Sequence, residues 1–179
     1  MRDSHQQERS LQHRQGESVI VAAVITVSDR SAAGERADSS GPRAVELLAA
    51  AGLAASTSIV PDGVESVRAA IQTAIDSGAR VVLTTGGTGL SARDLTPEGT
   101  RPLLQRELPG ISELLRGEGA KHTPMAVLSR GLAGIAGRSE EAQTLVVNLP
   151  GSVKAVEQGL AVLLPLIPHI LEQLDGRDH

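Results

Sequence analysis

Residues 80–97 read RVVLTTGGTGLSARDLTP, and the order of elements in this stretch decides the fold. Val81, Val82 and Leu83 form a short apolar run, which is typical of a strand buried on both faces of a parallel sheet. The run leads into the loop Gly86-Gly87-Thr88-Gly89. Glycine adopts positive φ angles and has no Cβ, so the N–H groups of such a loop can approach an anion closely. The stretch therefore predicts a phosphate-binding loop at the end of a buried strand.

An acidic residue follows this loop. Asp94 stands just ahead of Thr96 and Pro97, which suit the N-cap and the first position of a helix. Phosphate also binds at helix N-termini, but a carboxylate there repels phosphate unless a cation lies between them. The sequence therefore predicts a metal-bridged phosphate site. The alternative is an ordinary glycine-rich turn with Asp94 as a solvated acid, because short glycine motifs also recur by chance.

The first strand of the chain also ends in polar residues. Val19 to Val27 is a nearly continuous apolar run, typical of a central parallel strand, and it leads into Ser28, Asp29 and Arg30. Ligands of open α/β sheets bind beyond the carboxyl ends of the strands, so Ser28 and Asp29 are candidate site residues. The alternative is a loop ion pair between Asp29 and Arg30, which would contribute little.

A second acid follows the next expected strand, at residues 57–60. Asp62 lies in a Pro-Asp-Gly turn ahead of a helical pattern and three residues before Glu65. It can therefore be the N-cap of that helix in a capping-box arrangement, or a ligand facing the glycine loop. The succession of strands and helices up to residue 85 predicts a right-handed parallel sheet.

The second half predicts a hairpin and another strand-to-helix turn. Apolar segments at 132–136 and 144–148 flank a charged turn, which indicates a β-hairpin with a longer loop. The second segment leads into Pro150-Gly151, and Ser152 can cap the helix that follows. Lys154 in the first turn of this helix is either solvated or meets a bound anion, because a cation there opposes the helix dipole.

Composition favours a single soluble α/β domain. The chain has 179 residues, 40% hydrophobic and 21% charged, and no cysteine. No apolar run approaches the ~18 residues of a membrane span, and the N-terminus lacks the apolar segment of a signal peptide. We therefore expect a cytoplasmic protein without a membrane partner. Residues 1–18 are polar and without periodicity, which predicts a disordered N-terminal extension.

Charge and aromatic content limit the possible ligands. The net charge is −4, and the chain has no Phe, Tyr or Trp. Binding to single-stranded nucleic acid needs a positive groove and stacking platforms, so we expect no nucleic-acid partner. The core must consist of Val, Ile, Leu and Ala. A planar ligand can be held only by aliphatic faces and guanidinium planes.

Six motifs in order resemble the MogA/MoaB family of molybdenum-cofactor biosynthesis proteins, which includes gephyrin-like and plant Cnx G domains. The resemblance covers residues 19–175 as one domain and implies a three-layer α/β/α sandwich with a mostly parallel central sheet and a small β-hairpin. The usual assembly of the family is a homotrimer. The motifs are VSDR (27–30), VPD (60–62), TTGGTG (84–89) with RDLTPE (93–98), LPG (108–110), LSRG (128–131) and VNLPGS (147–152).

The resemblance implies a molybdopterin adenylyltransferase, in which the molybdopterin phosphate attacks the α-phosphorus of ATP in the presence of Mg²⁺. A MoeA-type protein takes the product and inserts molybdate. The alternative is a carrier or scaffold that binds molybdopterin or nucleotide without turnover. The family's two key aspartates match Asp62 and Asp94, expected to hold the metal. Other expected substrate or phosphate contacts are Ser28, Asp29, Gly86, Gly87, Thr88, Gly89, Glu98, Pro150, Gly151 and Ser152, followed by Ser129 and Arg130.

Two features depart from the family pattern. The family often places a small residue and a proline after NLPG, whereas this chain has Ser152 and Val153, so the helix can begin differently. The hairpin turn at 139–143 is also longer than usual and could alter subunit contacts. A dinucleotide-binding dehydrogenase is excluded, because GGTG is not G-x-G-x-x-G and follows the third strand rather than the first.

Overall fold

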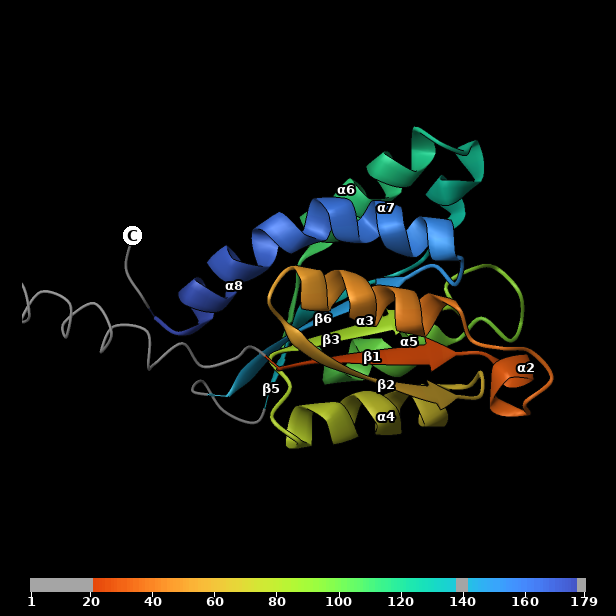
Figure 1. Cartoon of the computed structure of the whole chain (residues 1–179), viewed down its shortest axis with the longest axis horizontal. Helices are drawn as coiled ribbons and strands as arrows, with labels where there is room; N and C mark the ends of the chain where they lie inside the picture. Colours follow the sequence, from red (N-terminus) through yellow and green to blue (C-terminus); the bar gives the residue numbers. More distant parts are fainter. Residues whose placement is uncertain (1–20, 138–141, 177–179) are drawn as a thin grey trace, which may run out of the picture.

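A computed structural model describes residues 21–137 and 142–176. The expected N-terminal extension at 1–18 and most of the hairpin turn at 139–143 lie outside the described residues. Within the described part, the chain forms a central sheet with helices on both faces (Figure 1). The predicted three-layer α/β/α sandwich is confirmed.

The sheet has six strands in the order β2-β1-β3-β6-β5-β4. The strands β1, β2, β3 and β6 are parallel, while β5 pairs antiparallel with β6 and with β4. The predicted hairpin is therefore β5 and β6, and β4 forms the edge of this mostly parallel sheet beyond β5. The bounds are β1 (Val21–Val27), β2 (Ala54–Val60), β3 (Val81–Thr85), β4 (Arg106–Glu107), β5 (Ala133–Gly137) and β6 (Gln143–Leu149).

Helices cover the sheet in two layers. In Figure 1, α3, α6, α7 and α8 lie on one face of the sheet, and α4 lies on the other, where α5 packs against it. Their bounds are α2 (Asp29–Ala32), α3 (Ser40–Ala50), α4 (Val64–Asp76), α5 (Thr96–Thr100), α6 (Pro109–Ala120), α7 (Val153–Leu163) and α8 (Ile167–Leu174), with 3₁₀ turns η1 (Arg101–Leu103), η2 (Pro124–Leu128) and η3 (Leu164–Leu166).

Strand β3 separates two aliphatic cores. Successive side chains of a strand point to opposite faces, so Val81 and Leu83 belong to the core under α3, α7 and α8, whereas Val82 belongs to the core under α4. All five residues of β3 are buried, as the apolar run of its first three residues predicts. Packing on both faces therefore fixes the position of the strand, and with it the position of Gly86, where the glycine loop begins.

The structure shifts the bounds of several expected elements. Strand β2 begins at Ala54 rather than at residue 57, and the two hairpin strands run over Ala133–Gly137 and Gln143–Leu149 rather than 132–136 and 144–148. The four-residue α2 and the two-residue β4 were not predicted, because neither is long enough to show a periodic pattern.

The stretch Val153–Leu174 is the one described helical stretch long and apolar enough to cross a membrane. It combines α7, η3 and α8, and prolines interrupt it. Val156, Leu160 and Leu163 are fully buried in the core beneath α7. Packing against the sheet therefore accounts for the apolar face of this stretch.

Asn148 joins the sheet to the helix beyond the glycine loop. It is 2% exposed, and its amide nitrogen donates to the hydroxyls of Thr84 and Thr100, both at 3.0 Å. Its carbonyl oxygen accepts from the backbone N–H of Leu132 at 3.1 Å. Three segments of the chain therefore depend on one buried amide for their polar partners.

Replacing Asn148 by leucine should lower the free energy of unfolding by about 3 kcal/mol, because it removes the partners of the buried Thr84 hydroxyl and of the partly buried Leu132 N–H. Urea unfolding followed by far-ultraviolet circular dichroism measures the change. The exposed amide of Gln72 on α4 provides the control, and Gln72→Leu should change the free energy by less than about 0.5 kcal/mol. Equal stability of the two variants would contradict this role of Asn148.

Candidate functional site

The four parallel strands end at one edge of the sheet. Ser28 follows β1, Pro61 follows β2, Gly86 follows β3 and Pro150 follows β6. Because these strands run in the same direction, the turns that carry the predicted site residues gather at that edge. The structure thus brings together residues from four separate motifs.

The glycine loop is packed tightly between β1 and α5. Gly86 and Gly87 have φ angles of +104° and +62°, a region that favours glycine. A Cβ on Gly86 would lie 2.3 Å from the carbonyl oxygen of Val27, and one on Gly87 would lie 2.3 Å from Oγ1 of Thr96. Both positions therefore require glycine for conformation and for space.

Thr96 holds this loop and is not the predicted N-cap. The N-cap of α5 is Leu95, which makes no side-chain capping bond. The Thr96 hydroxyl instead donates to the carbonyl oxygen of Gly86 at 2.9 Å, and its backbone N–H donates to that of Gly87 at 3.0 Å. The loop gains a buried anchor, which local sequence could not indicate.

Asp62 does not cap α4, so the capping-box prediction is wrong. Gly63 is the N-cap of α4, with no side-chain capping bond. Oδ2 of Asp62 accepts from the backbone N–H of Asp29 at 2.8 Å, and Oδ1 of Asp29 accepts from the backbone N–H of Asp62 at 3.0 Å. The reciprocal pair ties the turn after β1 to the turn after β2.

Arg93 neutralises Asp29. Its guanidinium donates to both carboxylate oxygens of Asp29 at 2.7–3.0 Å and to the backbone carbonyl of Asp62 at 3.0 Å. The alternative prediction of an ion pair between Asp29 and Arg30 is therefore wrong, because the arginine that pairs with Asp29 is Arg93. Asp29 serves to fix the orientation of Asp62, and its charge is already compensated.

Asp62 and Asp94 lie against the same loop. Oδ1 of Asp62 would be 3.3 Å from a Cβ on Gly87, and Oδ2 of Asp94 would be 2.9 Å from a Cβ on Gly89. Oδ2 of Asp94 also accepts from the backbone N–H of Ser91 at 2.8 Å. Each acid thus commits one oxygen to a backbone N–H, while its Oδ1 accepts no hydrogen bond from the described residues.

Arg130 clamps the outer side of the loop. Its backbone N–H donates to the carbonyl of Thr88 and its Nε to that of Gly89, both at 2.8 Å. Nη2 donates to the backbone carbonyl of Asp94, and Nη1 pairs with Glu98. The hydrogen bond from Arg130 lowers the pKa of the Glu98 carboxyl below its ordinary value. Glu98 lies in this clamp and lines neither of the two cavities described next.

A large cavity of about 950 Å³ opens beside the loop, between α6, η2 and α7. Thr88 and Gly89 line one side of it, and Pro150 and Ser152 line another. Its walls also include the aliphatic side chains of Leu115, Ala126, Leu128 and Leu149. A cavity of this size and character is typical of a small-molecule site.

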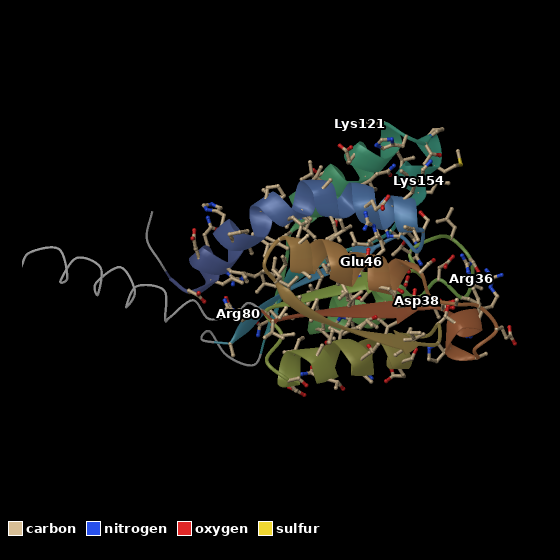
Figure 2. All side chains as sticks on the ribbon, viewed as in Figure 1. Arg36, Asp38, Glu46, Arg80, Lys121 and Lys154 are labelled. Carbon is tan, nitrogen blue, oxygen red and sulfur yellow. The ribbon has the colours of Figure 1, made fainter. Side chains whose placement is uncertain are left out.

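A smaller cavity of about 320 Å³ lies where the strand order reverses, between the ends of β1 and β3. Hydroxyl groups dominate its lining, which also includes Gly151, Arg36 and Asp38. Arg36 and Asp38 are labelled in Figure 2. The hydroxyls belong to Thr26, Ser28, Ser31, Ser39, Ser40, Thr85 and Ser152. Ser152 lines both cavities, so the two meet at the turn after β6.

Asp38 organises the smaller cavity and was not predicted. Its Oδ2 accepts from the hydroxyl of Thr26 at 2.6 Å, and its Oδ1 accepts from the backbone N–H groups of Ser40 and Gly41, both at 3.1 Å. These N–H groups belong to the first turn of α3. An acid two residues ahead of a helix with Pro42 in its first turn is the sequence signal that could have found it.

Comparison with known proteins identifies the family. The model of the family described as "probable molybdopterin binding domain" (MoCF_biosynth) matches residues 23–169, most of the chain. The chain belongs to this family. A molybdopterin adenylyltransferase from Pyrococcus furiosus is 45% identical over 150 residues, which are 83% of the chain and 88% of that protein. The predicted resemblance is therefore confirmed.

The chain is also similar to a longer bifunctional protein and to a solved structure. A molybdenum cofactor biosynthesis bifunctional protein from Synechococcus elongatus is 45% identical over 161 residues, 89% of the chain, and the chain spans about half (49%) of its length. The crystal structure of the tungsten cofactor synthesizing protein MoaB from Pyrococcus furiosus matches with a TM-score of 0.82 and 41% identity, over 89% of the chain and 99% of that protein. The MogA/MoaB-like fold is thus shown by sequence and by structure.

The structure divides the predicted site residues of this chain into two groups, those that lie at the glycine loop and those that pair with arginines. The glycine loop, Asp62 and Asp94 lie together, whereas Asp29 and Glu98 are ion-paired with arginines. Neither Asp62 nor Asp94 lines the two cavities; they lie against the loop whose residues Thr88 and Gly89 line the larger one. Ser152 caps α7 by accepting from the backbone N–H of Ala155 at 3.1 Å, as predicted, although Val153 replaces the family's proline.

Acid should weaken the Arg130 clamp through Glu98. Because the folded state lowers the pKa of Glu98, the pair contributes stability at neutral pH and loses it as the pH falls through the lowered pKa. The Glu98 side chain is 42% exposed, so the contribution is at most about 1 kcal/mol. Unfolding free energies of the wild type and Glu98→Gln should therefore differ at neutral pH and converge as the pH falls through the lowered pKa of Glu98. A difference that is constant with pH would contradict the ion-pair account.

Proposed function

We propose that this chain is a molybdopterin adenylyltransferase, which transfers AMP from ATP to the phosphate of molybdopterin. The observation that carries the proposal is the pair of cavities that meet at Ser152 beside a glycine loop flanked by Asp62 and Asp94. A transferase with two substrates needs two adjoining sites and an anion-binding loop close to both. The activity named for the Pyrococcus furiosus relative is the same.

The donor set fits Mg²⁺. Oδ1 of Asp62 and Oδ1 of Asp94 are the oxygens that would hold the ion, because neither accepts a hydrogen bond from the described residues. Mg²⁺ in nucleotide sites is held by one or two carboxylates, with substrate phosphates and waters completing its coordination. The described residues contain no group of three or more acidic, histidine or cysteine ligands, in keeping with such a partly open site. When bound, the ion would neutralise charge that develops on the phosphate oxygens.

The chain's own residues supply positioning. An oxygen of the molybdopterin phosphate forms a bond to the α-phosphorus of ATP, the bond from this phosphorus to the bridging oxygen breaks, and pyrophosphate leaves. A phosphate monoester is largely ionised at neutral pH, so the attacking oxygen needs no general base. The backbone N–H groups of Gly87, Thr88 and Gly89 would orient the phosphates, whereas that of Gly86 already donates to the carbonyl oxygen of Leu149 at 3.0 Å. Arg93 and Arg130 keep the loop and its acids in place.

A carrier or scaffold of the same fold is the second candidate, because a protein can keep a fold and the outline of a site without keeping the catalytic activity. The two acids favour the enzyme, since a carrier needs no metal at the transferred phosphorus. The test is to incubate the purified chain with ATP, Mg²⁺ and molybdopterin. An enzyme releases one pyrophosphate for each adenylylated molybdopterin; binding without pyrophosphate above the protein-free control would favour the carrier.

We also propose the family's homotrimer, a cytoplasmic location and transfer of the product to a MoeA-type protein. Exposed apolar side chains at the large cavity support a subunit or partner contact. Leu90 and Met125, which line the cavity, are 67% and 63% exposed, and Val127, between the lining residues Ala126 and Leu128, is 58% exposed. Exposed apolar surface gathered in one place is typical of protein interaction sites. Light scattering after gel filtration measures the assembly, and a monomer at micromolar concentration would reject the trimer.

A further inference from the structure

The large cavity is unusual in its charge. Two cationic side chains line it, Arg116 and Lys154, in a protein whose net charge is −4. His122 also lines it, but its ring lies 3.5 Å from the carboxylate of Glu118. The one acid in its lining, Glu157, is paired with Arg43 at 2.7 Å. The cavity is therefore positively charged over an aliphatic floor, which suits a ligand with an apolar body and anionic groups.

Arg116 is anchored in the wall of this cavity. Its Nη1 donates to the backbone carbonyls of Ser129 and Gly131 at 3.3 and 3.5 Å, and both residues also line the cavity. The side chain is half-buried on α6, and it forms no ion pair with a described carboxylate. One edge of the guanidinium is thus fixed by the backbone, while its positive charge is not neutralised by an acid.

A fixed guanidinium plane is a platform for a flat ring. Arginine stacks on aromatic faces and also donates to ring oxygens and nitrogens in a planar geometry. Proteins commonly use Phe, Tyr or Trp for this purpose, but this chain has none. Arg116 is the only guanidinium among the described residues that line the large cavity.

We propose that Arg116 holds the planar ring of the pterin substrate in the large cavity. The inference rests on the proposed function for the identity of the two substrates. The smaller cavity also has a basic residue in its lining, Arg36, but its seven hydroxyl groups and Asp38 suit the hydroxyls of a ribose. Lys154, in the first turn of α7, adds positive charge for the anionic side chain that molybdopterin carries; Figure 2 shows it at the start of that helix.

The test measures binding without turnover. The probe is pterin-6-carboxylate, which is fluorescent, titrated with wild type, Arg116→Met, Arg116→Lys and a control, Arg68→Met. Arg68 is an exposed arginine on α4, on the opposite face of the sheet. We expect Arg116→Met to raise the Kd at least ~10-fold, Arg116→Lys to restore little of the loss because lysine lacks the plane, and Arg68→Met to change nothing. Circular dichroism checks that each variant is folded.

Other outcomes separate this inference from the function. An unchanged Kd in Arg116→Met, or full affinity in Arg116→Lys, would overturn the role of the guanidinium plane. Loss of ATP binding in place of pterin binding would assign the cavity to the nucleotide and overturn the proposal. If pterin binding depends on Arg116 but no pyrophosphate forms with the full substrates, this inference stands and the enzymatic function fails.

Discussion

Asp94→Asn should lower the rate of Mg²⁺-dependent adenylylation by about 100-fold or more while the protein stays folded. Asparagine keeps the size of the side chain and can still accept from the Ser91 N–H, so the turn is preserved. It removes the negative charge beside Gly89, where a cation between the loop and the phosphates would need it. A loss of this size corresponds to about 2.7 kcal/mol of transition-state stabilisation.

Pyrophosphate release at a series of Mg²⁺ concentrations measures the effect. If Asp94 helps to hold the metal, the variant should require more Mg²⁺ for its half-maximal rate as well as having a lower maximum. Asp76→Asn, at the C-terminal end of α4, is the matched control and should behave as wild type. Near-normal turnover in Asp94→Asn, with an unchanged Mg²⁺ requirement, would remove Asp94 from the site.

Two substitutions of Asp62 should show its effect on activity separately from its effect on stability. Asp62→Ala removes the carboxylate and the acceptor for the Asp29 N–H, so we expect activity to be lost and the unfolding free energy to fall by about 1 kcal/mol. Asp62→Asn keeps an acceptor at the same place but not the charge, so it should lose activity by about 100-fold at nearly wild-type stability. The stability cost comes from the link between two turns, since Asp62 caps no helix.

Urea unfolding and pyrophosphate release on the same preparations give both quantities. Arg93 offers an internal comparison, because Arg93→Met breaks the contacts to Asp29 and Asp62 without altering either acid. If Asp62→Asn turns over at the wild-type rate, then Asp62 only joins the turns, and the proposed metal site loses one of its two ligands.

The sequence predicted the parts of the site that depend on local pattern. The buried run of β3, the glycine loop and the turns after β1, β2 and β6 follow from apolar periodicity and turn residues. Parallel strands then place those turns at one edge without further information. The fold class was predictable for the same reason, since strand, turn and helix signals alternate along the first half of the chain.

The partners of the polar side chains were not predictable. Asp62 reads as an N-cap from its neighbours, yet its partner is Asp29, which lies 33 residues earlier in the chain. Arg93 and Arg130 are two of many arginines in the sequence, and only the folded chain shows that they hold Asp29 and the glycine loop. Thr96 fits a cap by local preference, but the tertiary contact with Gly86 prevails.

The lack of aromatic side chains has a practical consequence for every binding measurement. Without Trp, Tyr or Phe, the protein is nearly transparent in the near ultraviolet. The absorbance and emission of a purine or pterin in the complex therefore belong to the ligand itself. Either ring can act as a label-free spectroscopic reporter of its own surroundings at equilibrium, with no background from the polypeptide to subtract.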